Sequence, residues 1–402
     1  MALIVLFWIP VAILTWVYLV YPIVAAAAAR LAPMRLRDEG PDPTVSVAIA
    51  VHDGAAQIAD RIANAFAQEA SGARVVEVIV GSDGSTDGTD AIVGDLARTE
   101  RRLRLHSLPR AGQTPTQHVL FEAGRGEIVV LTDAETRFAP GCVAALARAF
   151  RDPRVSCATG HLVWAGQDAT PTSHSEGVYW RYELRVRELE SRAGWLTAVT
   201  GALVAVRRSS YRPVPARSSM DELLPLYIRE EGGLVVYVAD AVAHDRPISS
   251  LREQFRTRCR IAARGIVANI SMLPRLPPWR YPGVVTAIVS HKLLRWATPW
   301  LVLVAAIGGG LLALAGSPLY AVAPVGLGVT LVCAGLAHVL MLRAGSAPRA
   351  LAFARAFVVV NLAFAVGWIN VLLGRRIERW QPATAGRKDQ PIADHGGAAR
   401  PG

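Results

Sequence analysis

One apolar stretch, Glu127–Thr136 (EIVVLTDAET), constrains the fold of this chain more than any other. Its β-branched and leucine-rich run is typical of a strand buried on both faces of a parallel sheet. The run ends in two acids separated by one residue, Asp133 and Glu135. Ligands of open α/β sheets gather at the carboxyl ends of strands, and two carboxylates there can hold a hard divalent cation. A polar loop that merely follows a strand is the alternative, because D-x-E is a short pattern with many chance matches.

Apolar residues are concentrated at the two ends of the chain. Of the 402 residues, 52% are hydrophobic, which is too many for an ordinary soluble enzyme. The segment Ala2–Ala29 exceeds the roughly 20 helical residues that span a bilayer core, and no positive charge precedes it as in a signal peptide. Arg30, Arg35 and Arg37 follow it. By the positive-inside rule, we expect residues 1–30 to be a signal-anchor helix in a bacterial-type inner (plasma) membrane, with the next domain in the cytoplasm.

The last third of the chain is also expected to meet the membrane. Residues 251–296 predict amphipathic interfacial helices, with Lys292, Arg295 and Trp296 as interface anchors. Residues 297–374 contain three apolar spans, and residues 375–402 form a polar tail. Three full crossings would put the basic tail outside, against the positive-inside rule. We favour a cytoplasmic tail with the third span, Leu351–Leu373, shallow or re-entrant; failure of the rule is the alternative.

The formal net charge of +11 fits loops that face anionic membrane lipids. We expect no nucleic-acid partner, because no zinc-finger, helix-turn-helix or aromatic RNA-binding pattern is present. The four cysteines are scattered without metal-site spacing, so neither a zinc site nor a disulfide framework is predicted.

Strand and helix patterns alternate in residues 45–250. Buried-type strands are expected at Val45–Val51 and Val75–Val80, with a helix at Ala55–Ala70 between them. After the second strand, the small residues of Gly81–Thr89 allow close backbone approach to a ligand, to which Asp83 could offer a carboxylate. Alternation of this kind predicts an α/β domain with a mostly parallel sheet and helices on both faces.

Several motifs, taken together and in order, resemble glycosyltransferase family 2. Five segments carry the resemblance: Val47–Asp53, Ser82–Thr89, Gly126–Thr136, Thr200–Arg208 and Ser219–Leu226, with Arg256–Ile261 where processive members carry Q-x-x-R-W. The resemblance implies the GT-A fold, related to the synthases of cellulose, hyaluronan and poly-N-acetylglucosamine. It also implies inversion at the anomeric carbon, a nucleotide-sugar donor, expected to be a UDP-sugar, and Mg²⁺ or Mn²⁺.

The chain departs from the family pattern at several positions. Asp53-Gly54 stands where Asn-Glu is common, and Gln113 and His118 replace a lysine and an asparagine. Glu135 replaces the usual second aspartate but still offers oxygen ligands. The Q-x-x-R-W position keeps Arg260 but lacks the aromatic residue, which favours the addition of one or a few sugars.

The resemblance and the chemistry of the reaction together suggest roles. Asp221 falls where the family carries its catalytic base. Glu135 is expected to bind the metal, and Asp133 the metal or the ribose. Asp53 and Asp83 would hold the nucleoside, and Arg258 and Arg260 the diphosphate. The alternatives are turn or helix-cap roles for Asp83, Asp87 and Asp221, and lipid contacts for the arginines.

The sequence therefore predicts a membrane-bound inverting glycosyltransferase that acts on a lipid or glycan acceptor at the cytoplasmic face. Two alternatives stay open. The chain could be a processive polysaccharide synthase that extrudes its product, or a non-catalytic subunit of a membrane synthase complex.

Overall fold

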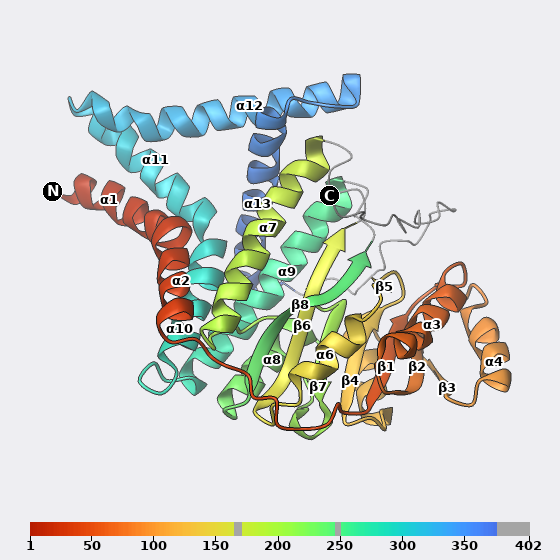
Figure 1. Ribbon diagram of the computed structural model, residues 1–402. Helices are drawn as coiled ribbons and strands as arrows, with labels where there is room; N and C mark the ends of the chain where they lie inside the picture. The colour runs from red at the N-terminus through yellow and green to blue at the C-terminus, as the bar shows by residue number, and fades with distance from the viewer. Residues whose placement is uncertain (165–170, 246–250, 376–402) are drawn as a thin grey trace, which may run out of the picture.

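The computed structural model describes residues 1–164, 171–245 and 251–375, and its centre is one eight-stranded sheet (Figure 1). The strand order is β3-β2-β1-β4-β7-β6-β8-β5. Neighbours β3-β2-β1-β4 are parallel, as are β6 and β8, whereas β7 runs antiparallel to both β4 and β6. The strands are β1 (Val45–Val51), β2 (Val75–Asp83), β3 (Leu103–Leu108), β4 (Ile128–Asp133), β5 (Arg137–Phe138), β6 (Val155–Trp164), β7 (Leu203–Arg207) and β8 (Leu234–Asp245).

Helices cover both faces of this sheet. Those of the sheet domain are α3 (Ile58–Phe66), α4 (Thr89–Thr99), α5 (Gln113–Ala123), α6 (Cys142–Ala149), α7 (Pro171–Arg192) and α8 (Met220–Glu230), with short helices η2 (Ala67–Ser71) and η3 (Arg208–Ser210). Successive side chains of a strand point to opposite faces. In β1, accordingly, Val47 and Ile49 pack with α3 and α6, whereas Ala48 and Ala50 pack with α5 and α8. The predicted α/β class with helices on both faces is confirmed.

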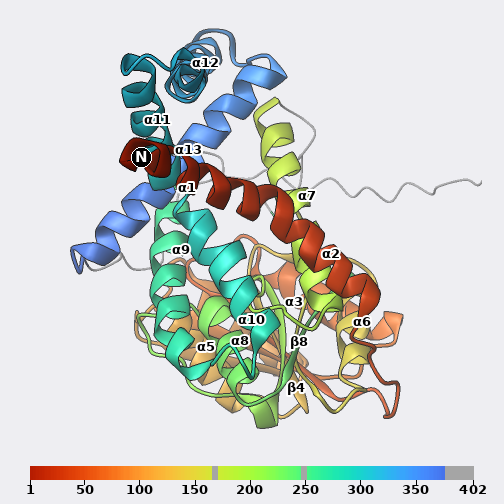
Figure 2. The ribbon, with the colours of Figure 1, turned by 90° about the vertical axis from the view of Figure 1, so that its left-hand side faces the viewer.

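The remaining helices come from the two ends of the chain and gather on one side of the sheet domain (Figures 1 and 2). They are α1 (Ala2–Thr15), η1 (Trp16–Val20), α2 (Tyr21–Leu31), α9 (Leu251–Met272), η4 (Leu273–Arg275), α10 (Pro282–Ala287), η5 (Ile288–Leu294), α11 (Thr298–Leu314), η6 (Pro318–Ala321), α12 (Val322–Ala344) and α13 (Arg349–Leu372). Helix α1 lies along α11, and α13 packs against α9. The expected helix at 251–273 is present, with Ala262 and Ile266 buried against α13.

Among the described residues, three helical segments are long and apolar enough to cross a membrane: Ala2–Leu31, Pro318–Ala344 and Arg349–Leu372. A fourth candidate, Pro282–Leu294 with Thr298–Leu314, is bent by 63° at its break. The bend therefore falls just before the first of the three C-terminal apolar segments. The third, which we expected to be shallow or re-entrant, is a continuous 24-residue helix.

The side chains expected to anchor the chain at the membrane interface lie inside the protein instead. Lys292, Arg295 and Trp296 are only 4–6% exposed. Lys292 and Arg295 lie within 4 Å of buried carboxylates, and Trp296 packs in a cluster with α9 and α13. Sequence spacing does not distinguish such a buried ion pair from an interfacial anchor, because both place cations beside apolar residues.

Candidate active site

The carboxyl ends of β1, β2 and β4 meet at one edge of the sheet and bring the predicted acids together. Strand β1 lies between the other two, with Ala50 opposite Asp133 and Val51 opposite Ser82. Asp53, Asp83 and Asp133 therefore follow or end three adjacent strands. The antiparallel strand β7 begins beside Thr132, so the loop that precedes it reaches the same edge.

Other carboxylates surround the Asp133 side chain. Its removal from water raises the pKa of its carboxyl to about 8, and the neighbouring carboxylates of Glu135, Asp245 and Asp221 add to the rise. The Gln113 amide opposes this effect by donating a 2.8 Å hydrogen bond to Asp133 Oδ1. A cation would stabilise carboxylates that lie this close together. The carboxylate oxygens around Asp133 are therefore chemically suited to bind a cation.

No group of three or more His, Cys, Asp or Glu side chains in the described part of the chain is arranged to hold a metal ion. Metal ions that serve phosphate chemistry usually take only one or two carboxylates from the protein and fill the other positions with phosphate oxygens and water. Asp133 and Glu135 are compatible with such a partial site.

Asp53 and Asp83 are both engaged within the protein. Asp53 has a backbone φ of +52°, in the left-handed region, and its Oδ1 accepts a 2.8 Å hydrogen bond from the Thr86 amide. Asp83 is 1% exposed. It pairs with Arg110 and accepts hydrogen bonds from the amides of Ala111, at 2.6 Å, and Gly112, at 3.0 Å. Asp83 thus fixes the loop that leads into α5, and its contact with a nucleoside stays a prediction.

Asp87 has the turn role that was the alternative for this motif. Its carboxylate accepts hydrogen bonds from the amides of Ala55, at 2.8 Å, and Thr89, at 3.1 Å. These bonds join the turn after β2 to the turn after β1.

Asp221 lies in the first turn of α8, where Ser219 is the N-cap residue. Its carboxylate accepts a hydrogen bond from the Ser219 hydroxyl, and its backbone oxygen accepts one from the Val199 amide at 3.3 Å. The side chain rests against Gly201, where an added Cβ would lie 3.3 Å from Asp221 Oδ2. Asp221 therefore lies against the loop before β7, and its charge acts on Asp133.

Arg260 of α9 also faces these acids. Burial and the neighbouring Arg264 lower the pKa of its guanidinium, whereas Asp221 and Asp133 raise it. Arg258 lies two residues earlier on the same helix, which turns it by about 200° from Arg260. The structure thus groups Arg260 with Asp133 and Asp221, and a common role for Arg258 and Arg260 remains a prediction.

Two residues of the site were missed in the sequence. Asp245 ends β8 beside Trp164, the last residue of β6, and its charge acts on Asp133. Arg61 of α3 is 0% exposed and donates hydrogen bonds to Thr132 Oγ1, at 3.0 Å, and to the Asp133 backbone oxygen, at 3.3 Å. An acid at the end of an apolar run was the available signal for Asp245. A lone arginine in an amphipathic helix gave no such signal.

Comparison with known proteins agrees with this arrangement. Residues 46–214 match the family described as Glycosyl transferase family 2. Two N-acetylglucosaminyltransferases are among the relatives, from Rhizobium sp. (strain N33), 27% identical over 252 residues, and from Rhizobium leguminosarum bv. viciae, 24% identical over 261 residues. These matches cover 58% and 61% of this chain, and 55% and 61% of the relatives. The chain thus spans little more than half of the length of these relatives.

A solved structure shares the fold over most of the chain. It is the mannosyltransferase PcManGT from Pyrobaculum calidifontis in complex with GDP-Man and Mn²⁺, with a TM-score of 0.68 and 22% sequence identity. The superposition covers 92% of this chain and 99% of that one. The family match, the strand order and the shared fold lead to one conclusion: residues 46–214 match glycosyltransferase family 2 and lie in a sheet domain with a GT-A-like fold.

Proposed function

We propose that the chain is a membrane-anchored, inverting glycosyltransferase that moves a sugar from a nucleotide sugar to a hydroxyl of a lipid or glycan acceptor at the cytoplasmic face. The observation that carries the proposal is the convergence of acids at the carboxyl edge of the sheet: Asp133 ends β4, and the charges of Glu135 and Asp221 raise its pKa. Asp133 and Asp221 in turn act on the guanidinium of Arg260. The names of the rhizobial relatives favour UDP-N-acetylglucosamine as the first donor to test.

Each of these four side chains has a role in the proposed reaction. Asp221 accepts the proton of the acceptor hydroxyl as its oxygen attacks the anomeric carbon. The bond from that carbon to the diphosphate breaks, and the nucleoside diphosphate leaves from the opposite side, which inverts the configuration. Arg260 faces the site and can neutralise charge on the leaving phosphates. Glu135 and Asp133 would hold Mg²⁺ or Mn²⁺, which would supply further positive charge to the diphosphate.

The membrane setting follows from the apolar helices. Ala2–Leu31 would anchor the domain, and Arg30, Arg35 and Arg37 would keep that domain on the cytoplasmic side. The acceptor would then be a lipid or a glycan presented at the inner surface of the membrane. The missing aromatic residue at Ile261 supports transfer of one or a few sugars.

A first experiment tests donor use and the base together. Purified full-length protein is incubated with a panel of UDP- and GDP-sugars, Mn²⁺ and a glycan acceptor, and released nucleoside diphosphate is measured. We expect one donor to be consumed, no turnover in EDTA, and at least a roughly 100-fold lower kcat in Asp221→Asn, because general bases contribute on the order of 10²–10⁴-fold.

The same assay separates the alternatives. Undiminished turnover in Asp221→Asn would remove Asp221 as the base. The absence of turnover with every donor would favour a non-catalytic subunit. Products many sugars long would favour a processive synthase.

A further inference from the structure

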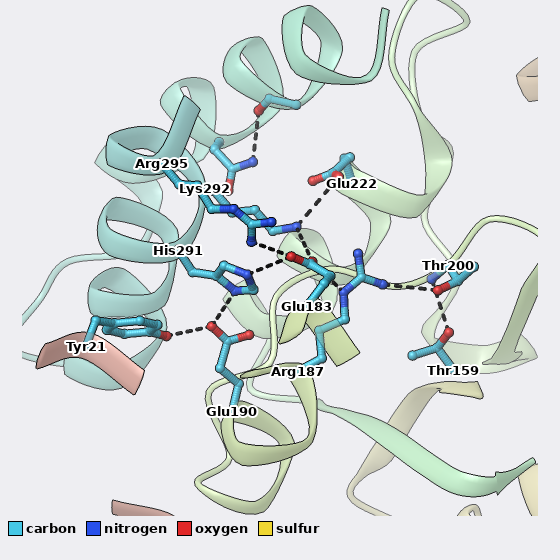
Figure 3. A network of polar contacts seen from close by, with 12 residues as sticks. Tyr21, Thr159, Glu183, Arg187, Glu190, Thr200, Glu222, His291, Lys292 and Arg295 are labelled. Atoms are coloured by element: carbon cyan, nitrogen blue, oxygen red, sulfur yellow. Dashed lines mark hydrogen bonds and ion pairs between the residues drawn. The ribbon is translucent and has the colours of Figure 1, made fainter. Parts of the chain in front are cut away.

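A cluster of charged side chains is buried between the sheet domain and the apolar helices (Figure 3). Glu183, Arg187 and Glu190 project from α7 at a spacing of four and three residues, which places them on one helix face. His291, Lys292 and Arg295 come from η5 and the residue after it, Tyr21 from α2, and Glu222 from α8. These eight residues, here called the α7 cluster, are each 1–8% exposed.

Glu183 is the centre of the cluster. Its carboxylate accepts hydrogen bonds from Arg187 Nε at 2.8 Å, from His291 Nε2 at 3.0 Å, and from Arg295. These cations hold the pKa of Glu183 well below its usual range in spite of its burial. On the far side of the imidazole, His291 Nδ1 lies 2.7 Å from Glu190 Oε1, which also accepts a hydrogen bond from the Tyr21 hydroxyl.

Arg187 connects this cluster to the loop before β7. Its Nη1 donates a 3.0 Å hydrogen bond to Thr200 Oγ1, and the Thr200 amide donates one to Thr159 Oγ1 at 3.1 Å. Thr200 is thus held from two sides, by α7 and by β6. Arg187 is itself oriented by Glu183 and is only 8% exposed. The loop around Thr200 therefore has little freedom to move.

The loop before β7 packs against Asp221 of α8. Val199 binds the Asp221 backbone, and Gly201 lies against its carboxylate. Thr200, which accepts the hydrogen bond from Arg187, lies between Val199 and Gly201 in the chain. A second connection runs through Lys292, whose Nζ lies 3.9 Å from both Glu183 and Glu222, the residue that follows Asp221 in α8.

We propose that Arg187 is a positioning residue that sets the Thr200–Gly201 loop, and through it Asp221, for proton transfer from the acceptor. The inference rests on the proposed function, because it requires Asp221 to act as the base. A purely structural ion pair would stabilise the fold but would have no selective effect on turnover. The hydrogen bonds of Arg187 go to Glu183 and Thr200, so its removal should spare donor binding.

The test compares Arg187→Met with Thr200→Val and with their double variant, in full-length protein. UDP with Mn²⁺ is the binding probe, and transfer from UDP-N-acetylglucosamine to N-acetylglucosamine is the activity. We expect each single variant to lower kcat at least tenfold while the donor KM and the Kd for UDP change less than threefold. The double variant should lose no more than the worse single one, since both remove the same contact. Arg187→Lys should recover part of the loss.

Arg229→Met is the matched control. Arg229 is another largely buried arginine, which clamps the carbonyls of Gly233 and Gly194 at the far end of α8. We expect a lower melting temperature with kcat within twofold of the wild type. A folded Thr200→Val or Arg187→Met protein with kcat within twofold would overturn the inference, and so would losses that multiply in the double variant.

The Asp221→Asn variant separates the two proposals. If it is inactive and Arg187→Met is active, only the positioning role fails. If Asp221→Asn is active, the proposed base fails and the positioning role fails with it. Absence of transfer by the wild type would likewise overturn both.

Discussion

At the scale of single residues, the chain uses acids in two different ways. Asp133, Glu135, Asp221 and Asp245 crowd together, and this crowding raises the pKa of Asp133. Asp83, Asp87 and Asp152, in contrast, are each matched by hydrogen-bond donors. The first arrangement costs stability in the absence of a cation, whereas the second stabilises the fold. This contrast distinguishes candidate site acids from structural ones better than the motif alone.

Asp152 gives a prediction at this scale. Its carboxylate binds Arg154 and accepts a 2.9 Å hydrogen bond from the Arg37 amide, so it fastens the segment after the anchor helix to the sheet domain. These bonds lower the pKa of Asp152 well below its usual range. The stabilisation is therefore full above the unfolded pKa, near 4, and is lost as the pH falls through the lower folded value.

We expect Asp152→Asn to lower the free energy of unfolding by about 1–3 kcal/mol at pH 7, because part-buried donors lose a charged acceptor. The difference from the wild type should shrink below about pH 4, where the Asp152 carboxylate of the unfolded wild type begins to be protonated. Thermal unfolding in detergent at several pH values measures this difference in stability. Asp95→Asn is the control, because Asp95 forms only an exposed pair with Arg98 and should change stability by less than about 0.5 kcal/mol. An effect of Asp152→Asn equal to that of the control would contradict the assignment.

At the scale of elements, most of the local structure could be predicted from the sequence. Strand β1 has the expected bounds, β2 begins at the expected residue, and α3 with η2 covers most of the helix expected at Ala55–Ala70. Hydrophobic periodicity is a local property, so it was sufficient there. The antiparallel direction of β7 could not be predicted, because a buried strand has the same apolar pattern in either direction.

The pairing of β6 with β8 supplies an element-scale prediction. The register shifts between Gly160 and His161. A Cβ on Gly160 would lie 2.1 Å from the Ala241 backbone oxygen. Backbone cannot move aside as a side chain can, so Gly160→Ala should destabilise the protein by about 1–3 kcal/mol or more.

Gly94→Ala is the matched control. Gly94 lies inside α4, and apart from the backbone of that helix no described part of the chain lies within 4 Å of an added Cβ. Alanine favours a helix over glycine by about 1 kcal/mol, so the same substitution should raise the melting temperature there. A melting temperature of Gly160→Ala at or above that of the wild type would show that the two strands pack less closely than described.

At the scale of the whole molecule, the bent helix pair allows a topology that reconciles the basic tail with the positive-inside rule. If Pro282–Leu294 and Thr298–Leu314 enter and leave the membrane on the same side, α12 and α13 are the crossings that follow the domain in the described part of the chain. Arg375, Arg376 and Arg379 would then follow the last crossing on the side of the domain, in keeping with the positive-inside rule. We predict this topology, because a helix pair with a 63° bend at its break fits a re-entrant loop as well as a broken span.

Reporter fusions test the topology. A fluorescent protein fused at the C-terminus should be bright, since it folds in the cytoplasm, and alkaline phosphatase fused after Gly345, between α12 and α13, should be active outside. The opposite pattern at both positions would mean that the bent pair crosses the membrane. The two fusions control each other, because they report opposite sides whether or not the bent pair crosses. A re-entrant third segment after a crossing pair would instead put both fusions in the cytoplasm.

The sequence by itself determined the class of the fold, the family and the acids at the strand ends, because these depend on periodicity and on motifs of adjacent residues. Tertiary structure alone decided which charges meet. Tyr21, Arg187 and His291 are more than 100 residues apart along the chain in all three pairings, yet they join one buried cluster. Lys292 and Arg295 resembled membrane anchors in the sequence because their carboxylate partner, Glu183, is distant along the chain. A charged side chain's partner is set by long-range packing, and that packing leaves no local pattern in the sequence.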